Sequence, residues 1–302
     1  MRHSRVINNV NVNPSSRRSS NYLIAATLLI VINLISSVND VLVYYVGQHI
    51  HPIQIAFIRF FVTMLSVLPF MLPKGRLYFK TRMLRMHFFR AAVGVVAIAA
   101  TTFSVLKVPL LKNTCILFSE PLIFLGLASV FLKEHVDIGR WGCAIVGFLG
   151  ILVMTYQDIQ TFNGWVLVSV LSAASFAFIT LIAKKMYASE PLYTMLFYFG
   201  LGTSILFLVP AIMVWSPLTW LQALLLIIVG INGNLMQVCM FKAFDLAEVS
   251  SYLPLRYTEM LFTLAFGYYL FGQKPSVSTM IGGMIIVAAA LTLAILERNK
   301  EK

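Results

Sequence analysis

The chain has 302 residues, of which 59% are hydrophobic and 11% are charged, and its mean hydropathy is +0.86. Soluble domains carry about 25% charged residues, so this composition excludes an ordinary globular fold. Apolar runs of about 20 residues recur along the whole sequence, and each is long enough to cross about 30 Å of hydrocarbon. The sequence therefore predicts an all-α polytopic protein of the lipid bilayer.

The first segment, residues 1–21, is polar and basic and is predicted to be a flexible cytoplasmic tail. It resembles the start of a signal peptide, but the apolar segment that follows is about 25 residues long and has no clear small-residue cleavage site. We therefore expect an uncleaved first transmembrane helix.

Ten transmembrane helices are predicted, over residues 22–46, 52–72, 88–107, 111–132, 140–156, 164–186, 191–214, 220–243, 251–271 and 278–296. Most of the Lys and Arg residues, Arg90 among them, fall in the loops and tails of one side. Because positive charge marks the cytoplasmic side, both termini are predicted to be cytoplasmic, in the cell inner membrane. The net charge of +12 is then a topology signal, and it implies no nucleic-acid partner.

The two halves of the sequence align with each other. SEPLIFLGLASVFLKEHVDIGRWGCAIVGFLGILV, which contains Glu120, matches TEMLFTLAFGYYLFGQKPSVSTMIGGMIIVAAALT, which contains Glu259. We expect repeats over residues 22–157 and 164–296, followed by a cytoplasmic tail at 297–302. Since five helices per half is an odd number, the second repeat must be inverted, and in transporters such repeats place the substrate between them.

Three of the predicted helices carry a polar stripe at helical spacing. The stripes are Asn33, Ser36, Ser37, Asp40 and Tyr44; Gly230, Asn234, Gln237 and Phe241; and Tyr252, Arg256, Glu259 and Thr263. Polar groups in contact with lipid are costly, so these stripes are expected to face each other or a wet cavity.

Each charged residue also has a structural interpretation. Asp40 and Arg59 lie at similar depth, so an ion pair between the first two helices competes evenly with substrate contact. Arg256 and Glu259 lie three residues apart and could satisfy each other, although a pair with no other role is a weak explanation for its mid-membrane position. Glu120 precedes a proline, and its carboxyl could instead serve the backbone turn that this proline disturbs.

Amide side chains and small residues have simpler interpretations. Asn33, Asn234 and Gln237 would most often form hydrogen bonds between helices. Small residues that would allow close helix packing are Ser169, Ala173, Ala177, Gly142, Gly147, Gly150, Gly282 and Gly283.

Enzymatic function is not expected. All five histidines fall in loops, tails or helix ends, which leaves no buried Ser–His dyad and no His-based metal site. The sequence also lacks a P-loop and a paired-aspartate cluster for diphosphate chemistry. We therefore predict no metal and no cofactor. A channel is a further alternative, but no pore-like ring motif is visible.

The segments PIQIAFIRFFVTMLSVLPF, LKNTCILFSEPLIFLGLASVFLKEHVDIGRWGCAIVGFLGILV and SSYLPLRYTEMLFTLAFGYYLFGQ resemble the EamA-type branch of the drug/metabolite transporter superfamily. Within it, SSVNDVLVYYVG, HIHPIQIAFIRFF and PLRYTEM look most like S-adenosylmethionine uptake carriers of intracellular bacteria. The resemblance implies two inverted five-helix repeats around a central cavity, with the fifth and tenth helices set apart. The sequence departs from the pattern in one place, because the loop glutamate kept as Glu134 is Gln273 in the second half.

The function predicted from these features is transport of a small polar metabolite by alternating access. The substrate that the resemblance favours is S-adenosylmethionine, taken up alone or in exchange for S-adenosylhomocysteine, and amino-acid or metabolite export is the alternative. Glu120 and Glu259 would meet its cationic groups and Arg256 its carboxylate. The aromatic candidates for its adenine and sulfonium are Tyr44, Tyr198, Tyr252, Tyr257 and Phe241. The sequence leaves open whether the chain forms a homodimer.

Overall fold

The computed structural model describes residues 14–105, 116–134, 136–154, 164–272 and 276–299. Its elements in chain order are α1 (Pro14–Gly47), α2 (Pro52–Met71), the 3-10 segment η1 (Leu72–Phe79), α3 (Leu84–Val105), α5 (Glu120–Leu127), the π-helical turn η2 (Ala128–Leu132), α6 (Ile138–Met154), α7 (Trp165–Tyr187), α8 (Leu192–Met213), α9 (Trp220–Leu246), α10 (Val249–Tyr252), the 3-10 segment η4 (Leu253–Thr258), α11 (Glu259–Phe271) and α12 (Val277–Asn299). The described part of the chain is thus helical, as predicted.

Seven of the described helices are long and apolar enough to cross a membrane, namely α1, α2, α3, α7, α8, α9 and α12. The segment α5–η2 and helix α6 are apolar but shorter. Large apolar side chains such as Leu167, Val209 and Leu291 lie exposed on the outside of the bundle. Such a surface would be unfavourable in water and suits contact with lipid. The protein is therefore a multi-pass membrane protein.

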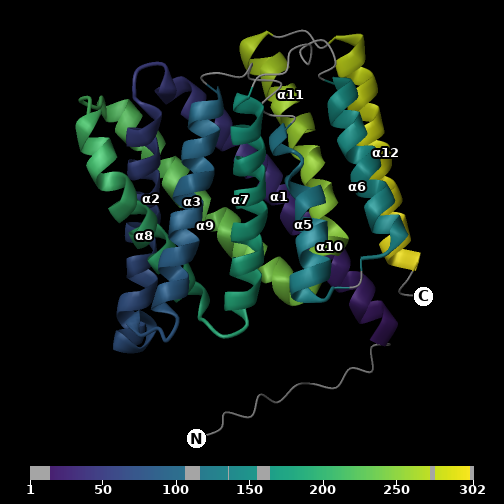
Figure 1. Ribbon diagram of the computed structural model, residues 1–302, viewed down its shortest axis with the longest axis horizontal. Coiled ribbons are helices and arrows are strands. Elements are labelled where there is room, and N and C mark those ends of the chain that lie inside the picture. Colours follow the sequence, from purple (N-terminus) through teal and green to yellow (C-terminus); the bar gives the residue numbers. More distant parts are fainter. Residues whose placement is uncertain (1–13, 106–115, 135, 155–163, 273–275, 300–302) are drawn as a thin grey trace, which may run out of the picture.

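The helices form one bundle in which distant parts of the sequence pack together (Figure 1). The pair α6 and α12 forms one edge of the bundle, and the pair α2 and α8 forms the other. Between these edges, α1 packs against α9, and α3 packs against α7. The start of α1 and the end of α12 lie at the same end of the bundle.

We call this end of the bundle the basic end, because Lys133, Lys184, Lys185, Lys242 and Arg298 all lie at helix ends on this side. The sequence predicted that most Lys and Arg residues lie on one side, and the positions of these five residues in the bundle agree with that prediction.

The segment predicted as a single ninth helix is interrupted. Its backbone runs from α10 through the 3-10 segment η4 into α11, and Pro254 lies in η4. Proline has no N–H for an α-helical hydrogen bond, which accounts for the local change of helix type. The expected stripe assumed an unbroken α-helix from Tyr252 to Thr263, and that assumption was wrong.

Helix α1 extends beyond its predicted start. It begins at Pro14, so helix occupies part of the segment 1–21 that was predicted as a flexible tail. The rest of that tail, the junction between the predicted repeats, Cys115 and Gln273 fall outside the described residues.

Small residues bring some of the helices close together, as predicted, but Gly142 is not one of them, because a methyl group there would meet no atom within 4 Å. A methyl group on Gly150 of α6 would come within 2.9 Å of Ile286 Cγ1 and 3.0 Å of the Gly282 carbonyl oxygen on α12. Ser169, Ala173 and Ala177 are fully buried along one face of α7. Such close approach is how apolar helices associate where lipid removes the usual hydrophobic drive.

Gly150→Ala should lower the thermal stability of the detergent-purified protein, because overpacking a close helix contact costs about 1–3 kcal/mol. Gly142→Ala on the same helix is the matched control, since a methyl group there meets no atom within 4 Å. Fluorescence-detected unfolding of both variants measures the difference. Equal melting temperatures would contradict the close packing of α6 on α12.

Candidate functional site

Three charged side chains from two distant segments meet inside the bundle. Arg256 Nε lies 3.4 Å from Glu120 Oε2 and 3.8 Å from Glu259 Oε2. Glu120 is 6% exposed and Glu259 is 8% exposed, whereas the Arg256 side chain keeps 25% of its surface accessible. We call Glu120, Arg256 and Glu259 the charged cluster. The structure thus brings the three residues together, and Arg256 interacts with both carboxylates and not only with its helical neighbour.

Both glutamates of the charged cluster stand at the first residue of a helix. Glu120 begins α5 after a turn, and Glu259 begins α11 after η4. Each break has a nearby proline, Pro121 in the first turn of α5 and Pro254 in η4. A carboxylate at a helix N-terminus is stabilised by the N–H groups that have no helical partner there. The two halves of the chain therefore present similar backbone breaks beside one arginine.

Helix α1 holds the second break in place through side-chain amide and hydroxyl groups. Asn33 Nδ2 donates to the Leu255 carbonyl oxygen at 3.1 Å and to Thr258 Oγ1 at 2.9 Å. Ser37 Oγ donates to the Glu259 carbonyl oxygen at 3.2 Å. A backbone carbonyl freed by a helix break must find a donor when it is buried. Asn33 therefore supports the charged cluster through the backbone, without contacting the carboxylates.

Asp40 lies one turn beyond Ser37 on α1. Its side chain lies at the surface of the bundle, within electrostatic range of Glu259, Arg59 and Arg256. Asp40 and Arg59 attract each other electrostatically, but their side chains form no direct ion pair. The Arg59 guanidinium lies 5.8 Å from the ring centroid of Phe60 instead. The structure therefore does not contain the possible ion pair between Asp40 of the first helix and Arg59 of the second. Asp40 instead adds a formal negative charge near the charged cluster.

The remaining predicted site residues lie elsewhere. Asn234 Nδ2 donates to the Thr63 carbonyl oxygen and to Ser66 Oγ, both at 2.7 Å, and so joins α9 to α2. Tyr252 is fully buried in the main apolar core, and its hydroxyl has no hydrogen-bond partner. Gln237 Oε1 accepts from Arg90 Nη2 at 2.8 Å. For Asn234 the structural interpretation, a hydrogen bond between helices, fits the contacts.

Arg90 is a buried charge that the sequence interpretation missed. The sequence counted it among the charges of the cytoplasmic loops, but it lies within α3 and is 3% exposed. Its guanidinium lies 4.3 Å from the Phe199 ring centroid and 5.8 Å from that of Phe241. The sequence did contain a signal that Arg90 belongs to a membrane helix, because the residue is followed by an apolar segment that continues to Val105.

A second group of charges ties the basic end together. Arg140 Nη1 lies 2.6 Å from Glu248 Oε2, and Arg140 Nε lies 2.9 Å from Glu297 Oε1. Glu134 accepts from the backbone N–H groups of Val249 at 3.3 Å and Ser250 at 3.0 Å. These contacts connect the segment after η2 and the starts of α6 and α10 to the end of α12.

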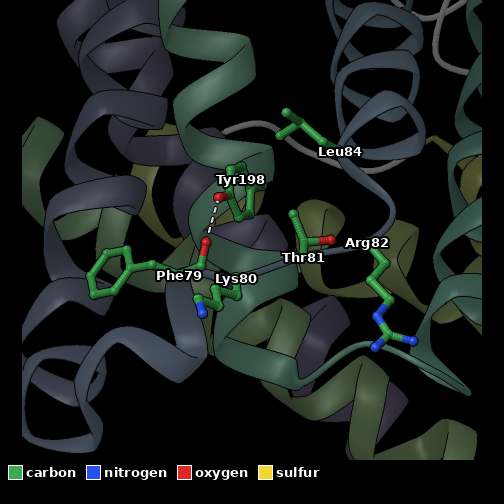
Figure 2. A pocket seen from close by; sticks show the side chains of 6 residues that line it. All are labelled: Phe79, Lys80, Thr81, Arg82, Leu84 and Tyr198. Carbon is green, nitrogen blue, oxygen red and sulfur yellow. Dashed lines mark hydrogen bonds between the residues drawn. The ribbon is translucent and has the colours of Figure 1, made fainter.

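A pocket of about 520 Å³ opens where α3 begins (Figure 2). It is lined by Phe79, Lys80, Thr81, Arg82, Leu84 and Tyr198. The Tyr198 hydroxyl donates to the Phe79 carbonyl oxygen at 2.8 Å, and Thr81 Oγ1 donates to Glu190 Oε1 at 2.8 Å. The pocket is therefore built from the basic segment between α2 and α3 and from one tyrosine of α8.

Comparison with known protein families identifies the chain. The EamA-like transporter family matches residues 23–156 and again residues 163–295. The chain belongs to the EamA-like transporter family. A solved crystal structure with 18% sequence identity covers 94% of this chain and 99% of its own, with a TM-score of 0.75, which shows that the fold is shared.

Several relatives carry transporter names. An S-adenosylmethionine uptake transporter of Rickettsia bellii is 33% identical over 87% of this chain and 91% of its own length. A riboflavin transporter of Vibrio cholerae is 25% identical over 82% of this chain and 84% of its own. A pseudopaline exporter of Pseudomonas aeruginosa is 23% identical over 68% of this chain and 73% of its own. The family and these names point to transport and not to an enzyme.

The ion pair between Glu120 and Arg256 should be visible in a double-mutant cycle. Arg256→Gln leaves two buried carboxylates without a counter-charge and should lower the free energy of unfolding by about 3 kcal/mol. Adding Glu120→Gln should recover part of this loss. Denaturant unfolding of the purified variants measures both effects, and additive losses would show that the two side chains do not interact.

Proposed function

We propose that the protein is a secondary transporter of the cytoplasmic membrane that takes up S-adenosylmethionine, in exchange for S-adenosylhomocysteine, by alternating access. The Rickettsia bellii relative is named an S-adenosylmethionine uptake transporter, and this name supports the proposed substrate. The sequence similarity to that relative extends over most of both chains. Membership of the EamA-like transporter family supports transport as the activity.

The charged cluster is the observation that carries this proposal. Two carboxylates and one guanidinium give it a formal charge of −1, and Asp40 and Arg59 nearby leave that sum unchanged. When both carboxylates are ionised, this net negative charge attracts a cation in a low-dielectric surrounding. S-adenosylmethionine has a sulfonium and an ammonium group that could meet Glu120 and Glu259. The accessible part of Arg256 lets a ligand compete with the existing pairs.

An inverted repeat of ten transmembrane helices is part of the proposal. It is supported by the two matches to one family and by the packing of the helices. In such a repeat α1, α2, α3 and α5 of the first half correspond to α7, α8, α9 and α11 of the second. The contact of α1 with α9 then corresponds to that of α7 with α3, and the contact of α2 with α9 corresponds to that of α8 with α3. Likewise, the contact of α5 with α7 corresponds to that of α11 with α1. Inverted repeats favour a substrate site between the halves, where discontinuous helices meet.

The basic end would face the cytoplasm, and both chain termini would lie there, by the positive-inside rule. The contacts of Glu134 and Arg140 would then keep the cytoplasmic side closed, since they tie α10 to α6 and α12. Release of substrate into the cytoplasm would require some of these contacts to break.

Export of an amino acid or a related metabolite is the alternative within the same family. A relative named as an exporter matches 68% of this chain, and a zwitterionic amino acid would also suit a cluster of mixed charge. The direction of transport therefore has to be measured.

Bacteria that express the protein should accumulate labelled S-adenosylmethionine above an empty-vector control. Unlabelled S-adenosylhomocysteine should inhibit this uptake, whereas methionine and threonine should not. No uptake by cells in which the protein is shown to reach the membrane would contradict the proposed substrate. Vesicles preloaded with unlabelled substrate should show accelerated uptake, as carriers do and channels do not.

Glu259→Gln should reduce this uptake at least about tenfold while the protein still inserts and folds, because it removes one charge that a cationic substrate meets. Asp245→Asn is the control, because it also removes an acidic charge but does so at the basic end, where Asp245 accepts a hydrogen bond from the Tyr187 hydroxyl. Near-normal uptake by the Glu259 variant would contradict the role of the charged cluster.

A further inference from the structure

Arg90 is held deep in the bundle by neutral groups. Its Nη2 donates to Gln237 Oε1 at 2.8 Å, and its Nη1 lies 3.5 Å from the Met195 carbonyl oxygen. Its Nε is buried and has no hydrogen-bond partner. The rings of Phe199 and Phe241 lie near the guanidinium. The side chain is therefore positioned from α8 and α9 without a carboxylate.

A guanidinium stays protonated, so this arrangement buries a full positive charge. Burying a charge is costly unless an opposite charge and enough hydrogen bonds compensate it. Cation–π contacts and one amide oxygen compensate only part of that cost. The structure thus keeps a buried cation with unused capacity for an anion.

An acidic residue near this part of α3, Glu190, contacts His87 and Thr81. Glu190 Oε2 lies 3.6 Å from His87 Nε2, one turn before Arg90 on α3, and Glu190 Oε1 accepts from Thr81. Two other arginines inside the described part of the chain have carboxylate partners at ion-pair distance, whereas Arg59 has none but lies within electrostatic range of Asp40. Arg256 meets two carboxylates in the charged cluster, and Arg140 meets two at the basic end. Arg90 has no such partner.

Helix α9 connects Arg90 to the neighbourhood of the charged cluster. Gln237 binds Arg90 of α3, and the preceding residue, Met236, accepts through Sδ from Asn39 Nδ2 of α1 at 3.8 Å. Asn39 is followed by Asp40, which lies within electrostatic range of Arg256 and Glu259. Consecutive residues of α9 therefore contact the helix that carries the unpaired cation and the helix that carries acidic Asp40.

The pocket of Figure 2 approaches Arg90 from the basic end. Leu84 and Tyr198 line that pocket, and they belong to the helices that carry Arg90 and Phe199. The ring of Tyr198 lies 5.0 Å from that of His87, which is one turn from Arg90. Along α3, His87 therefore lies between Leu84 of the pocket and Arg90.

We propose that Arg90 binds the carboxylate of the transported zwitterion, with Gln237 holding the guanidinium in place. This assignment rests on the proposed function. It replaces Arg256 as the partner of the substrate carboxylate, because Arg256 already has two carboxylates. Recognition is then divided between the charged cluster, which takes the cation, and Arg90, which takes the anion.

The test compares S-adenosylmethionine with its decarboxylated analogue, which differs only by the missing carboxylate. Equilibrium binding of both to the detergent-purified protein should favour S-adenosylmethionine at least about tenfold, the size expected of a charge-assisted hydrogen bond. Arg90→Gln should bind the two ligands about equally, and Arg90→Lys should lie between that variant and the wild type.

Gln237→Glu provides a second variant that keeps the fold. The new carboxylate would occupy the position of Gln237 Oε1, 2.8 Å from the guanidinium, and compensate the buried charge. It should abolish the preference for S-adenosylmethionine, whereas the neutral control Gln237→Met, which removes only the hydrogen bond that positions the guanidinium, should weaken the preference without abolishing it.

The outcomes separate the two claims. A wild type that binds neither ligand overturns the proposed substrate and this assignment with it. A wild type that binds S-adenosylmethionine but does not discriminate against the analogue overturns the assignment alone. The assignment alone is also overturned if the Gln237→Glu variant, or a folded Arg90→Gln variant, keeps the wild-type preference for S-adenosylmethionine.

Discussion

Charged side chains inside a bilayer need partners from the protein itself, and this requirement organises the interior of the bundle. Arg256 meets Glu120 from the first half of the chain and Glu259 from its own half. The pairing joins two segments that are far apart in sequence, and each glutamate is the first residue of its helix. Because water is scarce there, breaking the pairing without replacing it would be costly. A cationic ligand that meets the carboxylates can replace part of it.

The breaks in the backbone and the charged cluster depend on each other. A helix break in the membrane exposes carbonyl and N–H groups, which must be satisfied by other parts of the protein. Asn33 and Ser37 supply donors to the carbonyl groups around η4, and each of the two glutamates is the first residue of a helix. Side chains of α1 therefore fix the position of Glu259, and movement of α1 would be transmitted to the cluster. Such coupling is what alternating access around a central site requires.

The sequence predicted the features that depend on composition and on local cost. Apolar length revealed the membrane helices, and the cost of burying a carboxylate singled out Glu120 and Glu259. It failed where the outcome depends on how helices pack. The stripe through Tyr252 assumed a regular α-helix. The chain instead changes to the 3-10 segment η4 at Pro254, and the Tyr252 side chain lies in the apolar core. Arg90 was assigned to a loop because sequence hydropathy alone cannot tell an interfacial charge from one that α8 and α9 enclose.

The account depends most on the charged cluster being the place where the cationic part of the substrate binds. The most direct measurement is an experimental structure of the protein with S-adenosylmethionine bound. The account predicts that the sulfonium or the ammonium group lies within about 5 Å of the carboxylates of Glu120 and Glu259, where opposite charges interact strongly. A ligand bound elsewhere, with Arg256 still paired to both glutamates, would contradict it.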